Sequence, residues 1–372
     1  MINTDRSTLY RLDILNQQQM RVNYQQSSNE KINDGSDDSV IYSQKLFLED
    51  KVNVYEGLKT QINNTTAQNK VSDSTLATIM EQLDKIKNEL IKGRNDTNDD
   101  ISRKSIATQI EGAKENLYTF VNERVQDEYI FSGSETNKQA FTQDANGKVS
   151  YNGNTSLRKS AVEVDSYRER GVTGLDIMSY TTTAGVSGQP LSFKEGERII
   201  DENGREWKLN AAQTVLVEYD EDGKSTKNFI EVTTTGESPD KVHEIAELPK
   251  NEDGGEKTFS AKHNTFDAID DAIAALRNND GDAISKALDD INKAWNAANT
   301  AHGELGARNA TFNAAEERVS TKVTHFDVLA IQNNAADMTK VAIESQQLQL
   351  IYTSIYSSIS KASKLSLVNY LS

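Results

Sequence analysis

The sequence contains no cysteine among its 372 residues. This excludes disulfide bonds, thiolate catalysis, zinc–thiolate sites and iron–sulfur clusters together. Long hydrophobic runs are also missing, since the longest has five residues, Ala272 to Leu276. A membrane-spanning helix needs about 20 apolar residues. Residues 1–6 contain no apolar segment of the kind found in cleaved secretory signals, so we expect no such signal.

Basic residues are fewer than acidic ones. The chain has 41 Lys and Arg residues against 57 Asp and Glu residues, a formal net charge of −16. An acidic surface repels phosphate backbones and anionic lipid headgroups. We therefore expect neither a nucleic acid nor a membrane as a partner.

Proline and glycine are scarce outside the middle of the chain. All three prolines and 13 of the 20 glycines lie between residues 133 and 256. Because these residues interrupt helices and form turns, the two ends are predicted to be helical and the middle to turn. Two hairpins are predicted there, with strands at 199–200 and 207–209 around Asn203-Gly204, and at 215–217 and 229–232 around Asp222-Gly223. Asn146-Gly147 and Asn152-Gly153 mark two further candidate hairpin turns.

The C-terminal third repeats apolar residues at alternating steps of four and three. This spacing predicts one helix over residues 282–331 with a continuous apolar stripe, which needs a partner along its length. The proposed bundle core consists of Ile284, Leu288, Ile291, Trp295, Phe312, Val319, Val323 and Phe326. The repeat breaks at residues 332–337, where a joint is predicted. It then resumes as a proposed assembly seam of Met338, Val341, Leu348, Tyr352, Ile355, Ile359 and Ala362.

The N-terminal third offers partner helices. A weak stripe predicts a helix over 38–70 that begins at Ser36-Asp37-Asp38, and Asp73 or Ser74 is expected to cap a second helix over 76–90. Gly93 and the polar residues 94–100 separate this second helix from a third over 106–120. Residues 1–30 have too few apolar positions to form a stable helix alone. We expect the terminal seam to find its full partners only between chains.

No catalytic or metal-binding pattern stands out. No two of the four histidines have metal-ligand spacing on one helix face, and His302 is expected to be a packed or hydrogen-bonded seam residue. Paired acids occur at Asp270-Asp271 and Asp289-Asp290, but helix starts and solvated faces account for them better than the facing carboxylates of a glycosidase. We expect no cofactor, no metal and no enzymatic activity.

Several short motifs resemble the flagellin family of bacterial axial proteins. They are Ser27 to Asp38 near the N-terminus, Leu305-Gly306-Ala307-Arg308, and Ser366-Leu367-Val368-Asn369-Tyr370-Leu371 near the C-terminus. Tyr129 to Thr136 is most similar to the segment that closes the helical domain in the hook–filament junction members. The resemblance covers about 1–135 and 265–372, and it departs from the family at Asn29-Glu30, where members usually have a glycine.

The resemblance implies a mainly α fold with a β-rich insert, in which both termini form a long helical bundle or coiled coil and the insert is a small, mostly antiparallel domain. The expected domains are terminal coiled helices (1–35 and 335–372), a long helical bundle (36–135 and 265–334) and an outer insert (136–264). It also implies a structural subunit of the extracellular flagellum that is required for motility. Such a subunit is exported unfolded through a type III channel and assembles as a ring.

The implied partners are copies of itself, a junction protein on the hook side, and flagellin or a second junction protein on the filament side. An export chaperone is expected at the C-terminal helix. Three alternatives stay open: a filament flagellin, a secreted surface glycosidase, and a type III needle-tip or translocator protein.

Overall fold

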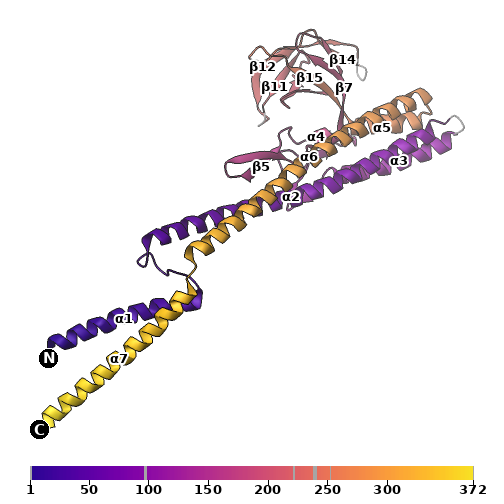
Figure 1. Cartoon of the computed structure of the whole chain (residues 1–372). Coiled ribbons are helices and arrows are strands. Elements are labelled where there is room, and N and C mark those ends of the chain that lie inside the picture. The colour runs from indigo at the N-terminus through magenta and orange to yellow at the C-terminus, as the bar shows by residue number, and fades with distance from the viewer. Residues whose placement is uncertain (1, 96–98, 221–222, 238–240, 252, 372) are drawn as a thin grey trace. The chain divides into compact units, whose positions relative to one another are not determined.

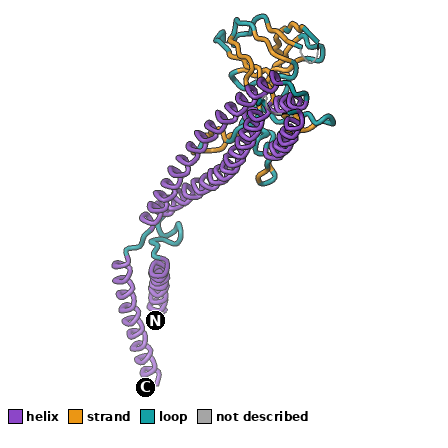
Figure 2. Tube along the Cα trace, turned by 90° about the vertical axis from the view of Figure 1, so that its right-hand side faces the viewer, coloured by secondary structure: helices purple, strands orange, loops and turns teal. Residues whose placement is uncertain are grey.

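The structure, a computed structural model of the whole chain, describes residues 2–95, 99–220, 223–237, 241–251 and 253–371, with the backbone alone for 2–8 and 362–371. Helices occupy both ends of the chain, and almost all strands lie between residues 124 and 264 (Figure 2). The predicted fold class, mainly α with a mostly antiparallel β insert, is confirmed. The helices are α1 (Ile2–Ser28), α2 (Ser39–Gly93), α3 (Asp100–Phe120), α4 (Gly174–Ile177), α5 (Thr265–Arg277), α6 (Gly281–Asn334) and α7 (Met338–Leu371).

The long C-terminal helix and its joint form as predicted. One helix, α6, runs from Gly281 to Asn334, and α7 begins at Met338, so the break falls within residues 335–337. The predicted start of α2 is also confirmed, because Asp38 Oδ1 accepts hydrogen bonds from the amides of Val40 and Ile41.

The predicted cap at Asp73 or Ser74 is wrong, since α2 continues through both residues. Asp73 has another partner, because its Oδ1 lies 3.0 Å from His302 Nε2. With its carboxylate bound in this way, Asp73 does not compete for the helical hydrogen bonds.

The chain forms two compact units, residues 1–59 with 317–372 and residues 60–316. In the second unit, α3 and α5 pack side by side (Figure 1). Its buried helical residues include the predicted positions Leu76, Ile79, Leu83, Ile86 and Leu90 of α2 and Ile106, Ile110, Ala113 and Leu117 of α3. At the end of α2, a Cβ on Gly93 would lie 2.5 Å from Leu276 Cδ2, so glycine lets α5 approach closely.

The insert is built from short strands. These are β1 (Arg124–Val125), β2 (Glu128–Tyr129), β3 (Phe141–Gln143), β4 (Val149–Tyr151), β5 (Arg158–Glu163), β6 (Ser166–Arg170), β7 (Ser179–Val186), β8 (Leu191–Lys194), β9 (Arg198–Asp201), β10 (Glu206–Leu209), β11 (Val215–Tyr219), β12 (Ser225–Glu231), β13 (Thr233–Thr235), β14 (Val242–Ile245) and β15 (Thr258–Asn264). A six-stranded sheet has the order β12-β11-β10-β9-β15-β7, and a three-stranded sheet has the order β13-β14-β8. Their buried side chains include Phe193, Trp207 and Phe259.

Three of the four predicted hairpins form. The turns at Asn203-Gly204 and Asn146-Gly147 join paired antiparallel strands, and β11 pairs with β12 around Gly223. Asp222 lies outside the described residues. The prediction for Asn152-Gly153 is wrong, because the strands on either side, β4 and β5, belong to different sheets. A Cβ on Gly153 would lie 2.6 Å from the Ser132 carbonyl oxygen, so close backbone approach accounts for this glycine.

Candidate assembly interface

The terminal helices α1 and α7 pack against each other within one chain. Leu15 and Val22 from α1 form a buried cluster with Val341 and Leu348 from α7. The hydroxyl of Tyr352 donates to Asn16 Oδ1 at 2.6 Å beside this cluster. A helix too polar to be stable alone is therefore held by a small apolar contact with the other end of the chain.

The predicted assembly seam divides into covered and open positions. Val341 and Leu348 are buried, and Tyr352 and Ile355 are half-buried against the same cluster. Met338 and Ile359 are exposed, and the side chain of Ala362 lies outside the described residues. The expectation that the seam finds its partners only between chains is therefore wrong for Val341 and Leu348, because α1 of the same chain already covers them.

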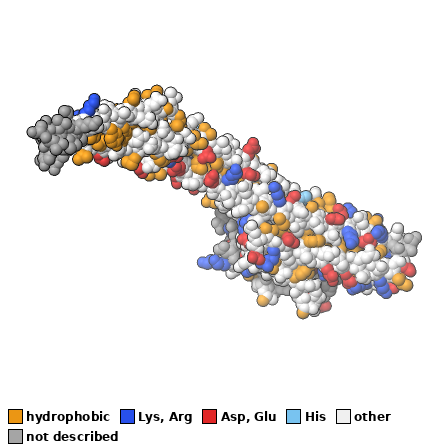
Figure 3. All heavy atoms as spheres, turned by 90° about the horizontal axis from the view of Figure 1, so that it is seen from below, with side chains coloured by type: hydrophobic (Ala, Val, Ile, Leu, Met, Phe, Trp, Pro, Cys, Tyr) orange, Lys and Arg blue, Asp and Glu red, His pale blue; other side chains and the backbone are white. Residues whose placement is uncertain are grey.

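A second apolar surface faces away from this contact. On α7, Ile343 and Leu350 are two residues beyond Val341 and Leu348, which is a rotation of about 200° around the helix. Leu350 is 71% exposed. We define the outward face as the exposed apolar side chains Leu9, Tyr10, Ile14 and Met20 of α1 and Ile343 and Leu350 of α7. Figure 3 shows that hydrophobic side chains are exposed along the part of the chain formed by the terminal helices.

The outward face was not predicted from the sequence, although the residue spacing of α7 contains a signal for it. Ile343 and Leu350 are seven residues apart, which is the same heptad step that defined the predicted seam, in a different phase. The predicted seam and the stripe of Ile343 and Leu350 repeat on the same helix, and only the first was recognised. Exposed apolar side chains that are contiguous on a surface are typical of a protein interaction site.

The joint between the terminal helices and the rest of the chain is a short antiparallel contact. Glu30 and Ala335 form an isolated β-bridge, and the amide of Lys31 donates to the Asn334 carbonyl at 2.6 Å. Asn29 has φ of 58°, in the left-handed region that glycine favours and asparagine tolerates better than most residues. Asn29 can therefore take a backbone conformation that glycine otherwise provides.

A polar cluster holds Glu30 in this joint. The hydroxyl of Tyr24 donates to Glu30 Oε2 at 2.6 Å, and Lys45 Nζ lies 3.0 Å from the same oxygen. The hydrogen bond from Tyr24, with that from Lys45, holds the pKa of the Glu30 carboxyl below its usual value. The same hydrogen bond raises the pKa of Tyr24. The joint thus depends on an ionised carboxylate.

The proposed bundle-core residues lie along α6. Ile284, Leu288, Ile291, Phe312 and Val319 are buried, while Trp295, Val323 and Phe326 are half-buried. The ring of Phe326 stacks on Tyr55 with centroids 5.6 Å apart.

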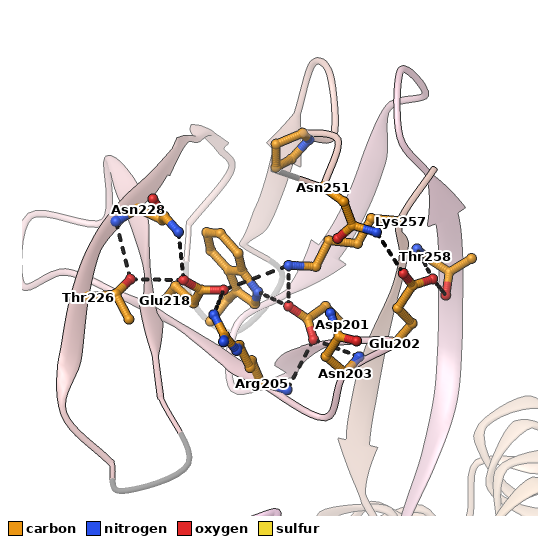
Figure 4. A network of polar contacts seen from close by, with 12 residues as sticks. Asp201, Glu202, Asn203, Arg205, Glu218, Thr226, Asn228, Asn251, Lys257 and Thr258 are labelled. Atoms are coloured by element: carbon orange, nitrogen blue, oxygen red, sulfur yellow. Dashed lines mark hydrogen bonds and ion pairs between the residues drawn. The ribbon is translucent and has the colours of Figure 1, made fainter. Parts of the chain in front are cut away.

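The insert contains a dense polar network (Figure 4). Lys257 Nζ lies 2.6 Å from Asp201 Oδ2 and 3.7 Å from Glu218 Oε1. The indole nitrogen of Trp207 also donates to Asp201. Burial opposes ionisation of Glu218, but hydrogen bonds from neighbours including Asn228 outweigh burial and hold its pKa below the usual value.

This network is the nearest approach to a pair of catalytic carboxylates that we find in the described part of the insert. Both carboxylates are almost fully buried and bound to the same amino group. Neither lines the cavity beside Arg158 and Arg170, the cavity beside Tyr151 and Asp267, or the cavity beside Tyr167 and Arg308. The arrangement suits a structural cluster better than the substrate cleft that a glycosidase needs.

Within the described residues, two kinds of site are absent. No group of three or more His, Asp or Glu side chains there is arranged to hold a metal ion. No helix there combines the length and hydropathy that crossing a membrane requires.

Paired terminal helices, a jointed helical region and an inserted antiparallel β domain define the fold seen in solved flagellar hook-associated proteins. The chain is similar to FlgL of Xanthomonas campestris, with 16% identity and a TM-score of 0.51 over 76% of this chain and 99% of that one. It is similar to flagellar hook-associated protein-3 of Legionella pneumophila, with 16% identity and a TM-score of 0.52 over 77% and 98%.

A third structure, from Vibrio parahaemolyticus and described as a candidate flagellar hook-associated protein, gives 14% identity and a TM-score of 0.54 over 80% of this chain and 99% of that one. No protein-family model and no curated protein sequence matches the chain. At these identities the likeness establishes a shared fold.

Proposed function

We propose that this protein is a structural subunit of the bacterial flagellum at the junction between hook and filament, in the role of hook-associated protein 3. Two independent observations support this role. The fold is shared with solved hook-associated proteins along nearly the whole length of those chains. The outward face leaves large apolar side chains uncovered on helices that already pack together, which suits a subunit completed by its neighbours.

In this proposal, copies of the chain assemble as a ring through the outward faces of α1 and α7. The contact within the chain, around Leu348, holds the two helices in the pairing that presents this surface. The three-part division remains part of the proposal: terminal helices at 1–35 and 335–372 for assembly, a bundle at 36–135 and 265–334, and an outer insert at 136–264.

The proposed neighbours are a junction protein on the hook side, and flagellin or a second junction protein on the filament side. An export chaperone would cover α7 before assembly, because its apolar side chains otherwise face water. The protein would be extracellular after export without a cleaved signal, and would be required for motility.

The closest competing function is a filament flagellin, which shares the same class and differs in its place along the axis. A junction protein is needed in few copies, whereas a flagellin forms long filaments alone. Electron microscopy of a deletion strain separates the two. Intact hooks without filaments, together with secreted flagellin in the medium, support the junction role. Short or absent filaments with no free flagellin would favour the flagellin function, and normal filaments would exclude both.

A further inference from the structure

The hairpin of β5 and β6 places two positive charges directly opposite each other. Arg158 and Arg170 are register partners in this antiparallel pair. Arg158 has a carboxylate partner, since Glu128 Oε2 lies 2.6 Å from its NH1. Arg170 donates instead to the neutral side-chain oxygen of Gln68. Two arginines and one glutamate leave this cluster with an excess of one positive charge. Like charges that face each other across a strand pair are also destabilising.

The environment of Arg170 makes that excess costly. Burial, together with the charge of Arg158, lowers the pKa of Arg170 to about 10. Arg170 is still charged at neutral pH, and no ion pair to it is found among the described residues. A partly desolvated charge of this kind is stabilised by a counter-ion.

A cavity adjoins the two guanidinium groups. Its volume is about 20 Å³, and its lining includes Asn69, Arg158, Arg170 and the backbone around Gly171. Asn69 is only 2% exposed, and its Nδ2 has no hydrogen-bond acceptor among the described residues. Other lining groups are committed elsewhere, since Ser72 Oγ donates to the Gln68 carbonyl and Gln68 Oε1 accepts from Arg170. Asn69 therefore contributes a donor with unused capacity to the lining of this cavity.

We propose that this cavity, between α2 and the β5–β6 hairpin, binds a single chloride ion. Three properties of the site select it. The volume matches one particle of roughly water size, for which about 10–15 Å³ suffices, so carboxylates and phosphates are too large. An uncommitted N–H donor lines the space, and a halide accepts hydrogen bonds without offering any. The excess positive charge favours an anion over a water molecule. The bound ion ties the hairpin to α2 through Asn69 and Arg170.

Thermal unfolding of the purified full chain tests the site. Sodium chloride and sodium gluconate are compared at equal ionic strength, because equal ionic strength gives equal screening of surface charge. We expect a Tm that is a few degrees higher in chloride, with an increment that saturates as chloride rises. Arg170→Met should abolish this increment. Arg168→Met, two residues earlier on the same strand and outside the cavity, should retain it.

A second measurement does not depend on the folding of a variant. Crystals of the unmodified chain soaked in sodium bromide should show an anomalous peak within hydrogen-bonding distance of Asn69 Nδ2 and the Arg170 guanidinium. An ordered water there with no anomalous signal would overturn the proposal. So would equal Tm values in chloride and gluconate, or a chloride increment that persists in Arg170→Met. None of these results tests assembly through α1 and α7, so the chloride site can be refuted without refuting the proposed function.

Discussion

Two leucines on α7, two residues apart, allow packing within the chain to be separated from contact between chains. Leu348 is 5% exposed and contacts the cluster formed with α1, whereas Leu350 is 71% exposed on the outward face. Leu348→Asp and Leu350→Asp make the same chemical change at the same depth in the same helix, so the loss of helix propensity is equal and cancels in the comparison. The difference between them reports burial alone.

The expected magnitudes follow from the covered area. Burying a leucine side chain fully is worth roughly 1.5–3 kcal/mol, and an unpaired carboxylate placed in the cluster adds a desolvation cost. Leu348→Asp should therefore cost about 3 kcal/mol or more. A cluster of four buried residues cannot absorb that loss, so α1 and α7 should separate. Leu350→Asp should cost less than about 1 kcal/mol, because little of this side chain is covered.

Hydrogen exchange on the dilute monomer measures the first effect, and sedimentation velocity at rising concentration measures association. Leu348→Asp should exchange rapidly in α1 and α7 and fail to associate. Leu350→Asp should exchange like the unmodified chain and still fail to associate. Normal association of Leu350→Asp would refute the assignment of the outward face, and unchanged exchange in Leu348→Asp would refute the role of the buried cluster.

Three further predictions concern charge. Lys257→Met removes the cation beside buried Asp201, while Glu218 keeps Arg205, so the insert should lose up to about 3–5 kcal/mol of stability, measured by denaturant unfolding with tryptophan fluorescence. The pKa of Glu30 is lower in the folded chain, so the ionised carboxylate stabilises the joint above the ordinary pKa of 4.5, and this stabilisation is lost as the pH falls below that value. Hydrogen exchange at residues 29–32 should therefore become faster in acid. Glu30→Gln should show the same fast exchange already at neutral pH. Added salt should strengthen self-association by screening the net charge of −16, and an association constant that falls with salt would contradict this.

Helix location could be predicted wherever the apolar period was local. The heptad step gave α6 to within a few residues and located the break before Met338, because each turn of a helix repeats the pattern of the last. The same reasoning failed at Asp73. Its capping chemistry is real, but His302, more than 200 residues away in the chain, binds the carboxylate instead.

Hairpins could be predicted and the sheet order could not. Asn-Gly and Asp-Gly turns mark neighbouring strands because the turn itself needs a positive φ. The six-stranded sheet, however, places β15 between β9 and β7, so Ala261 pairs with both Ile199 and Thr183. That pairing joins segments about 60 or more residues apart, and it leaves no pattern within either strand that a sequence window can detect.

The distribution of charge also bears on how an acidic protein could self-associate. Residues 2–28 carry three arginines against two aspartates, and residues 338–372 carry three lysines against one glutamate. These segments together have a net charge of +3, so residues 29–337 carry −19. Repulsion between copies therefore originates away from the helices proposed to meet. Since charges beyond a Debye length of about 10 Å are largely screened at 0.1 M salt, the apolar outward faces can approach while the acidic remainder keeps copies apart elsewhere. Net charge and contact surface thus favour association through α1 and α7 over association through the insert.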